Sequence, residues 1–221
     1  MGRQSRSSTV CRPEPGSRRP RCLSIASCDV RDGSTLAPVP VTQNTGTSQL
    51  AMLKHRGRLD PGSGRHTVLD LDWRPMFWSS PDQASAEYDA LLDHVTVAVG
   101  NRAEVEVAVG TSDPDEAATR LLDRGLELAL VKMGGEGVLV ATPDSRDVVA
   151  PHPVEVVCGL GAGDAFGGAL VHGLLAGWEP ATIARYANAA GAIVASRLSC
   201  ADAMPTLDEL TRLVDSEEGA S

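Results

Sequence analysis

The chain has 221 residues, of which 42% are hydrophobic and 22% charged, and these proportions are ordinary for a globular protein. It contains no apolar run near the roughly 18 residues that a membrane span needs, so we expect no membrane partner. The five cysteines lack C-x2-C spacing and predict neither a zinc site nor a disulfide framework, and since the basic N-terminus has no apolar signal region we expect a cytoplasmic protein.

Charge divides the chain into two parts. Residues 1–66 hold 11 Lys and Arg against four Asp and Glu, whereas residues 67–221 hold nine against 25. Residues 1–48 show no hydrophobic period, so we expect a basic, disordered leader, followed by a short helix over 49–58. The leader lacks the aromatic residues and motifs of nucleic-acid binders, so no nucleic acid partner is expected. The predicted organisation is a leader over 1–64 outside the fold, a domain over 65–215 and a tail over 216–221.

From His66 onward, apolar segments of strand length and helix length alternate. The expected strands are 67–72, 95–100, 128–132 and 137–141, and the expected helices are 82–93, 114–124, 164–176, 180–197 and 206–214. Strands that alternate with helices predict an α/β protein whose mostly parallel sheet is covered on both faces. Ligands of such a sheet bind at the carboxyl ends of its strands.

The sharpest motif is the glycine-rich stretch 159–169, GLGAGDAFGGA. Glycines ahead of a helix let backbone N–H groups point outward together, and the helix dipole adds positive potential, which favours an anion. Asp164 would lie in the first turn, where it could take a proton from a hydroxyl during phosphoryl transfer. A Walker loop is excluded because no Lys follows the glycines. A dinucleotide fingerprint fits only loosely, and a plain glycine-rich helix start also stays open.

Asn101 and Glu104 follow the end of a predicted strand. Two oxygen-bearing side chains three residues apart could hold a hydrated Mg²⁺ near phosphates. The same pair also has the spacing of a capping box at a helix start. The residues alone leave both interpretations open.

Three further stretches carry candidate binding residues. The stretch Lys132–Gly137 joins two predicted strands and could pass close to a nucleotide or form a plain hairpin turn. Asp72 and Arg74 follow a strand, where the guanidinium could bind a carboxylate or phosphate or make a surface salt bridge. Asn188 lies in a small-residue stretch that fits either close helix packing or the seat of an adenine ring.

Taken in chain order, these segments resemble the PfkB/ribokinase family of carbohydrate kinases. The likeness rests on DLDWRPMFW (70–78), HVTVAVGN (94–101), GLGAGDAFGGAL (159–170) and ANAAGAIVASRLSCADAMPT (187–206). These phrases are most similar to sugar-acid kinases that act on 5-dehydro-2-deoxygluconate. The resemblance implies a three-layer α/β/α ribokinase-like core, ATP and Mg²⁺ as cofactors, and phosphorylation of a small sugar acid on a primary hydroxyl.

The resemblance also implies a role for each candidate residue. Asp164 is the expected catalytic base, and the expected anion hole is formed by Gly161, Ala162 and Gly163. Asn101 and Glu104 are expected to organise Mg²⁺. The expected nucleotide-binding residues are Lys132, Gly134, Gly137 and Asn188, and the expected substrate-binding residues are Asp72 and Arg74.

Two features depart from the pattern of that family. Its members begin with a glycine-rich sugar-binding region and a small β-sheet lid, and residues 1–64 supply neither. Cys158 stands where the family has Asp or Asn, which leaves a monovalent-cation site there open. We therefore carry two interpretations, an ATP-dependent sugar-acid kinase and a non-catalytic nucleotide-binding remnant of one. A homodimer is one assembly open to such a chain.

Overall fold

The computed structural model describes residues 27–30, 50, 53–54, 64–198 and 201–218. Six strands form one sheet in the order β1-β2-β3-β4-β5-β6. They are β1 (Ser27–Val30), β2 (His66–Asp70), β3 (Val97–Asn101), β4 (Leu128–Lys132), β5 (Val138–Ala141) and β6 (Arg146–Val149). The helices are α2 (Pro81–Leu92), α3 (Arg102–Val109), α4 (Pro114–Asp123), α5 (Ala162–Ala176), α6 (Pro180–Ala195) and α7 (Leu207–Glu218). Short 3₁₀ turns lie at Pro75–Phe77, Gly134–Glu136 and Ala201–Ala203.

The sheet is mixed, where the sequence pattern predicted a mostly parallel one. The pairs β2–β3 and β3–β4 are parallel, whereas β1–β2, β4–β5 and β5–β6 are antiparallel. The reason lies in the connections: helices join β2 to β3 and β3 to β4, but only the short turn Gly134–Glu136 joins β4 to β5. A connection that short allows only an antiparallel hairpin.

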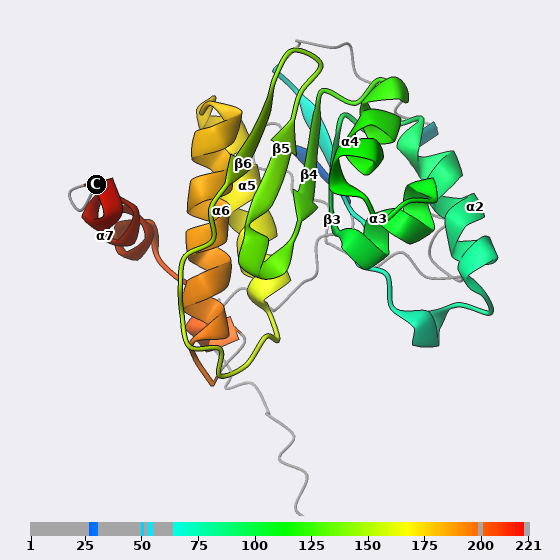
Figure 1. The fold of residues 1–221 in the computed structure, drawn as a ribbon. Coiled ribbons are helices and arrows are strands. Elements are labelled where there is room, and N and C mark those ends of the chain that lie inside the picture. Colours follow the sequence, from blue (N-terminus) through cyan, green and yellow to red (C-terminus); the bar gives the residue numbers. More distant parts are fainter. Residues whose placement is uncertain (1–26, 31–49, 51–52, 55–63, 199–200, 219–221) are drawn as a thin grey trace, which may run out of the picture.

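Helices cover both faces of the sheet, as the three-layer expectation required (Figure 1). Alternate strand residues point to opposite faces, and in β3 the side chain of Ala98 packs in one core cluster while Val97 and Val99 pack in the other. Helices α2, α3 and α4 supply the first cluster, and α5, α6 and α7 supply the second.

Local signals explain where the helices begin and end. Helix α2 begins after Ser80, whose hydroxyl accepts a hydrogen bond from the backbone of Gln83. Helix α4 begins after Asp113 in the same way, with a proline at its first position. Helix α5 ends at Gly177, a glycine in the left-handed region with φ 68°.

Part of the stretch predicted to lie outside the fold contributes to it. Strand β1 pairs with β2 over residues Ser27 to Val30. Leu53 is 2% exposed and belongs to the core cluster beneath α2, α3 and α4. The prediction of disorder over most of 1–48 lies outside the described residues. No helix among those that are described is long and apolar enough to cross a membrane.

Candidate active site

Three neighbouring strands deliver polar residues to one edge of the sheet. Asp70 ends β2, Asn101 ends β3 and Lys132 ends β4, and since these strands are parallel their carboxyl ends lie together. Asn101 and Lys132 are direct neighbours in the β3–β4 register. The glycine-rich stretch before α5 faces this edge, and a polar cleft lies between them. The cleft is lined by Asp70, Asp72, Trp73, Arg74, Asn101, Glu104, Lys132, Gly159, Leu160, Gly161, Gly163 and Asp164.

The start of α5 has the form of an anion site. Gly161 is the N-cap residue with φ 87°, a left-handed conformation that a side chain would strain. No side-chain hydrogen bond caps this end among the described residues, which leaves first-turn N–H groups for a ligand. A Cβ added to Gly163 would meet nothing within 4 Å, as expected for a residue that borders open space.

Asp164 lies in the first turn of α5 and lines the polar cleft. Partial burial raises the pKa of its carboxyl group above the usual value, and the charge of Asp72 raises it further. The cations Arg74 and Lys132 lower the same pKa by a smaller amount. A carboxylate with a raised pKa is a stronger base than an ordinary one, which suits proton transfer from a hydroxyl.

Asp72 and Arg74 form an ion pair at the mouth of the cleft. The Nε and Nη2 atoms of Arg74 lie 2.8 Å from Oδ1 of Asp72. Asp72 has φ 28°, the one positive value among the described residues other than glycine. Such a backbone conformation costs energy and is common at ligand sites. The Arg74 side chain is 55% exposed, so its guanidinium remains open to an anionic group.

Asn101 and Glu104 form the capping box of α3. The Asn101 side chain accepts hydrogen bonds from the backbone N–H groups of Ala103 and Glu104 at 2.9 and 3.0 Å. Oε2 of Glu104 accepts from the Asn101 backbone N–H at 2.6 Å. The structure therefore contains the helix-capping arrangement, and Glu104 still faces the polar cleft.

A second cleft adjoins the first and shares Asn101, Lys132 and Gly163 with it. All four predicted nucleotide-binding residues line it, and they come from two separate parts of the chain, the stretch 132–137 and helix α6: Lys132, Gly134, Gly137 and Asn188. The amide nitrogen of Asn188 donates to the backbone oxygens of Ala150 at 3.0 Å and of Val149 at 3.4 Å. Asn188 thereby holds the end of β6 beside α6.

The sequence analysis missed one wall of this second cleft. Pro151, His152 and Val154 follow β6 and line the cleft together with residues of α6. Their segment has no hydrophobic period or motif, and β6 itself was not predicted. The Pro151 and Pro153 pair was the available signal for an ordered, extended segment.

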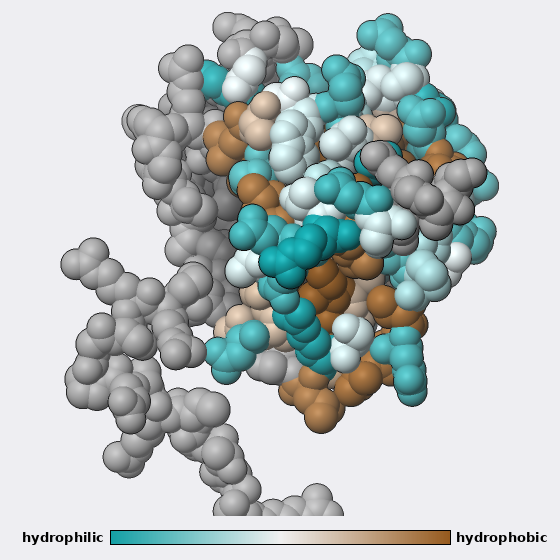
Figure 2. All heavy atoms as spheres, turned by 90° about the vertical axis from the view of Figure 1, so that its left-hand side faces the viewer, coloured by the Kyte–Doolittle hydropathy of each residue, from teal (hydrophilic) through white to brown (hydrophobic). Residues whose placement is uncertain are grey.

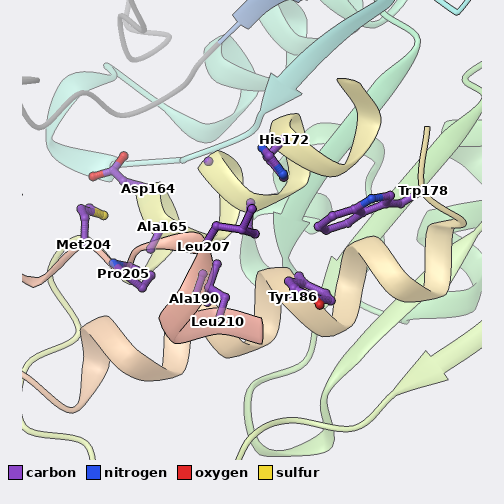
Figure 3. A pocket seen from close by; sticks show the side chains of 12 residues that line it. Asp164, Ala165, His172, Trp178, Tyr186, Ala190, Met204, Pro205, Leu207 and Leu210 are labelled. Atoms are coloured by element: carbon purple, nitrogen blue, oxygen red, sulfur yellow. The ribbon is translucent and has the colours of Figure 1, made fainter. Parts of the chain in front are cut away.

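Asp164 also borders a third hollow, formed by α5, α6 and the segment that leads into α7. Its walls are mainly apolar, and a chain of three rings closes the end away from Asp164 (Figure 3). The ring centroids of His172 and Trp178 are 5.2 Å apart, and those of Trp178 and Tyr186 are 4.6 Å apart. Figure 2 views this side of the molecule and shows hydrophobic side chains at the surface between hydrophilic ones.

The fold is a mixed-sheet α/β fold, and its polar cleft lies between the carboxyl ends of three parallel strands and the glycine-rich start of α5. Residues 62–207 match the pfkB family carbohydrate kinases, and the chain belongs to this family.

Two kinds of relative extend this result. The chain is 32% identical over 158 residues to the 5-dehydro-2-deoxygluconokinase of Geobacillus thermodenitrificans, which covers 68% of this chain and 47% of that protein. A putative ribokinase II from E. coli, solved with ATP and Mg²⁺, is 27% identical with a TM-score of 0.59, covering 66% of this chain and 47% of that one. The aminoimidazole riboside kinase of Salmonella enterica, solved with aminoimidazole riboside and an ATP analogue, is 25% identical with a TM-score of 0.60, covering 66% and 51%. The chain thus spans about half the length of the relatives that it matches.

Proposed function

We propose that this chain carries the nucleotide-binding and catalytic part of an ATP-dependent sugar-acid kinase. The proposed acceptor is 5-dehydro-2-deoxygluconate, or a similar sugar acid, and the proposed reacting group is a primary hydroxyl. The observation that carries the proposal is the position of Asp164. It lies in the polar cleft, one residue after Gly163, which lines both this cleft and the adjoining one.

Asp164 is the proposed base. Its carboxylate takes the proton of the acceptor hydroxyl as the oxygen attacks the terminal phosphorus of ATP. The backbone N–H groups of residues 161–163 are proposed to stabilise the negative charge on the transferred group, and that of Ala162 also donates to the carbonyl of Gly159 at 3.3 Å. These amides are fixed before the reaction by the start of α5, so no reorganisation is needed when the charge develops.

The nucleotide is proposed to lie in the second cleft. Gly134 and Gly137 give its backbone walls, and Asn188 with the small residues of α6 gives a flat surface for adenine. Asn188 acts there by holding the Val149 and Ala150 carbonyls, because its amide is already engaged with them.

Arg74 is the proposed partner of the substrate carboxylate. Its guanidinium lies at the mouth of the polar cleft and is more than half exposed. Asp72 orients this guanidinium through the shared Oδ1 contact, and a substrate carboxylate can occupy the remaining N–H groups.

The cleft fits a Mg²⁺ ion that keeps most of its waters better than one coordinated by several protein side chains. Among the described residues, no cluster of three or more His, Cys, Asp or Glu side chains has the arrangement of a metal cage. Glu104 and the buried Oδ1 of Asp70, which accepts no hydrogen bond within the described part, nevertheless present oxygen atoms toward the cleft. Mg²⁺ keeps several waters and binds through one or two carboxylates plus phosphate oxygens, which agrees with this pair. When bound, the ion would neutralise charge on the phosphates.

A non-catalytic nucleotide-binding protein is the second candidate. It is favoured by a difference between the two clefts. The four proposed nucleotide-binding residues all line the second cleft, whereas the two proposed substrate-binding residues, Asp72 and Arg74, form an ion pair with each other. The two candidates share a nucleotide site and differ in turnover.

The test separates these candidates. Calorimetry with ATP, with and without Mg²⁺, measures binding, and a coupled assay of ADP release measures turnover of 5-dehydro-2-deoxygluconate beside neutral sugars. Binding with turnover that requires the acid group supports the sugar-acid kinase. Binding without turnover supports the second candidate, and absence of ATP binding would contradict both.

A further inference from the structure

The ammonium group of Lys132 lies among side chains from three other elements. Its Nζ atom is 3.7 Å from Oε2 of Glu104 on α3 and 4.0 Å from Oδ1 of Asp70 on β2. It also lies 5.9 Å from the ring centroid of Phe166 on α5, within the range of a cation–π contact. The lysine therefore connects the ends of β2 and β4 with the starts of α3 and α5.

Both carboxylates beside this lysine are removed from water. The side chain of Asp70 is 9% exposed and that of Glu104 is 10% exposed. Two buried carboxylates that face the same space repel each other and lose their hydration, so they need a cation or additional hydrogen bonds. Glu104 has one such bond, from the backbone of Asn101, but Oδ1 of Asp70 has none within the described residues.

The carboxylates around Lys132 stabilise its ammonium group in the charged form. Burial alone would lower the pKa of its ammonium group, but Asp70, Glu104 and Asp72 together raise it above the usual value. In the described part of the cleft wall the other cation is Arg74, and it pairs with Asp72. Lys132 is thus the cation that faces Asp70 and Glu104.

We infer that Lys132 is a positioning residue whose ammonium group holds the carboxylates of Asp70 and Glu104 side by side at the carboxyl end of the sheet. The inference rests on the proposed function, because Asp70 and Glu104 are the residues proposed to face the nucleotide-bound Mg²⁺. Lys132 acts through these carboxylates, while its backbone and side-chain stem form part of the nucleotide cleft. A lysine that instead bound the phosphates would have to leave both carboxylates without their cation.

The first test uses the free protein and needs no nucleotide. The chain contains two lysines, Lys132 and the exposed Lys54, so acetylation by acetic anhydride followed by peptide mass spectrometry compares them in one sample. We expect Lys132 to react more slowly than the exposed Lys54, because its ammonium group is held between the carboxylates of Asp70 and Glu104. In Asp70→Asn and in Glu104→Gln, Lys132 should react several-fold faster while Lys54 keeps its rate. An unchanged rate of Lys132 in both variants would overturn the inference.

The second test separates positioning from phosphate binding. Calorimetry measures ADP affinity with Mg²⁺ and with EDTA for Lys132→Met, Lys132→Arg and the matched control Lys54→Met. Mg²⁺ should increase the ADP affinity of Lys132→Met about tenfold less than it increases that of the parent. Removal of residues that orient metal ligands has an effect of this size. Its metal-free ADP affinity should stay within about threefold of the parent, since only screened, longer-range charge is lost. Lys132→Arg should recover the Mg²⁺ gain.

The outcomes are distinguishable. A loss of metal-free ADP affinity of about tenfold or more in Lys132→Met, the size of a lost charged hydrogen bond, would assign the lysine to the phosphates and overturn the inference. An unchanged Mg²⁺ gain would also overturn it. If Lys132→Met does not fold, the double variant Asp70→Asn/Lys132→Met, which removes the unpaired carboxylate together with the lysine, should recover folding. Absence of ADP binding by the parent would refute the proposed function, and acetylation would still decide the lysine–carboxylate contact.

Discussion

Gly137, which joins the β4–β5 hairpin and lines the second cleft, provides a direct test of the hairpin geometry. Its φ of 95° and ψ of −146° belong to a region that is almost exclusive to glycine. A Cβ added there would overlap the carbonyl oxygen of Val149 and lie 3.0 Å from its carbonyl carbon and 3.2 Å from the Cα of Ala150. All three atoms are backbone, so a substitution must displace the end of β6.

We expect Gly137→Ala to lower the free energy of unfolding by about 2–5 kcal/mol, since a forbidden conformation costs about 1–3 kcal/mol and overpacking a similar amount. For a domain of this size, that loss corresponds to a fall in the unfolding midpoint of roughly 5–15 °C. Thermal unfolding followed by circular dichroism measures it directly.

Gly134 provides the matched control in the same turn. It also has a positive φ, 63°, but a Cβ there would meet nothing within 4 Å. Gly134→Ala should therefore cost only the left-handed conformation, about 1 kcal/mol or a few degrees. Equal midpoints for the two variants would refute the close approach of Gly137 to the end of β6.

Four further predictions test other parts of the molecule. Asp164→Asn should reduce turnover by about 10²–10⁴-fold with ATP affinity nearly unchanged, whereas the exposed control Asp147→Asn should keep full turnover. Equal turnover of Asp164→Asn and the parent in a coupled assay would show that Asp164 is not the base. Asn188→Ala frees the Val149 and Ala150 carbonyls, so calorimetry should show ATP binding weakened by about tenfold, the scale of one lost hydrogen bond with its unpaired partner. Leu53→Ala should lower the free energy of unfolding by about 2–5 kcal/mol, and a neutral result would contradict the placement of Leu53 in the core. Burial raises the pKa of Asp70 to about 7, so between about pH 4 and pH 7 the folded state binds a proton that the unfolded state has lost. The stability of the fold therefore falls as the pH rises from about 4 through 7. Asp70→Asn should raise the unfolding midpoint at pH 8 and give no gain near pH 4.

The strands and helices that the sequence predicted best carry strong local signals. The segments 128–132 and 114–123 match their predictions to within a residue, since one is a continuous apolar run and the other has Asp113 and Pro114 at its start. Strand β6 was missed because its sequence, RDVV, is exposed along most of its length and has no apolar alternation. It exists because β5 offers an edge with free backbone groups, and the short connection 142–145 returns the chain along that edge as an antiparallel hairpin.

Part of the candidate site could also be predicted from the sequence, and part could not. The glycine-rich start of α5 could be predicted because three close glycines and an Asp have few physical uses, and the structure brings the predicted residues Gly161, Gly163 and Asp164 to one cleft. The engagement of Lys132 with Asp70 and Glu104 could not be predicted, because it depends on the register of three strands and on the direction of α3. Spacing along the chain carries no information on a contact between residues 62 positions apart.

The strand directions explain why these separate motifs meet. Strands β2, β3 and β4 are parallel, so Asp70, Asn101 and Lys132 arrive at the same edge. Because β5 runs antiparallel to β4, the turn between them lies at this edge and places Gly134 and Gly137 beside Lys132. Strand β6 reverses direction once more, so its carboxyl end returns to the edge and the segment after Val149 becomes the outer wall of the second cleft. The change from parallel to antiparallel pairing at β4 therefore places a backbone turn, in addition to side chains, at the second cleft, where we propose that the nucleotide lies. It also puts Lys132 at the boundary of the two clefts, where one residue can influence both.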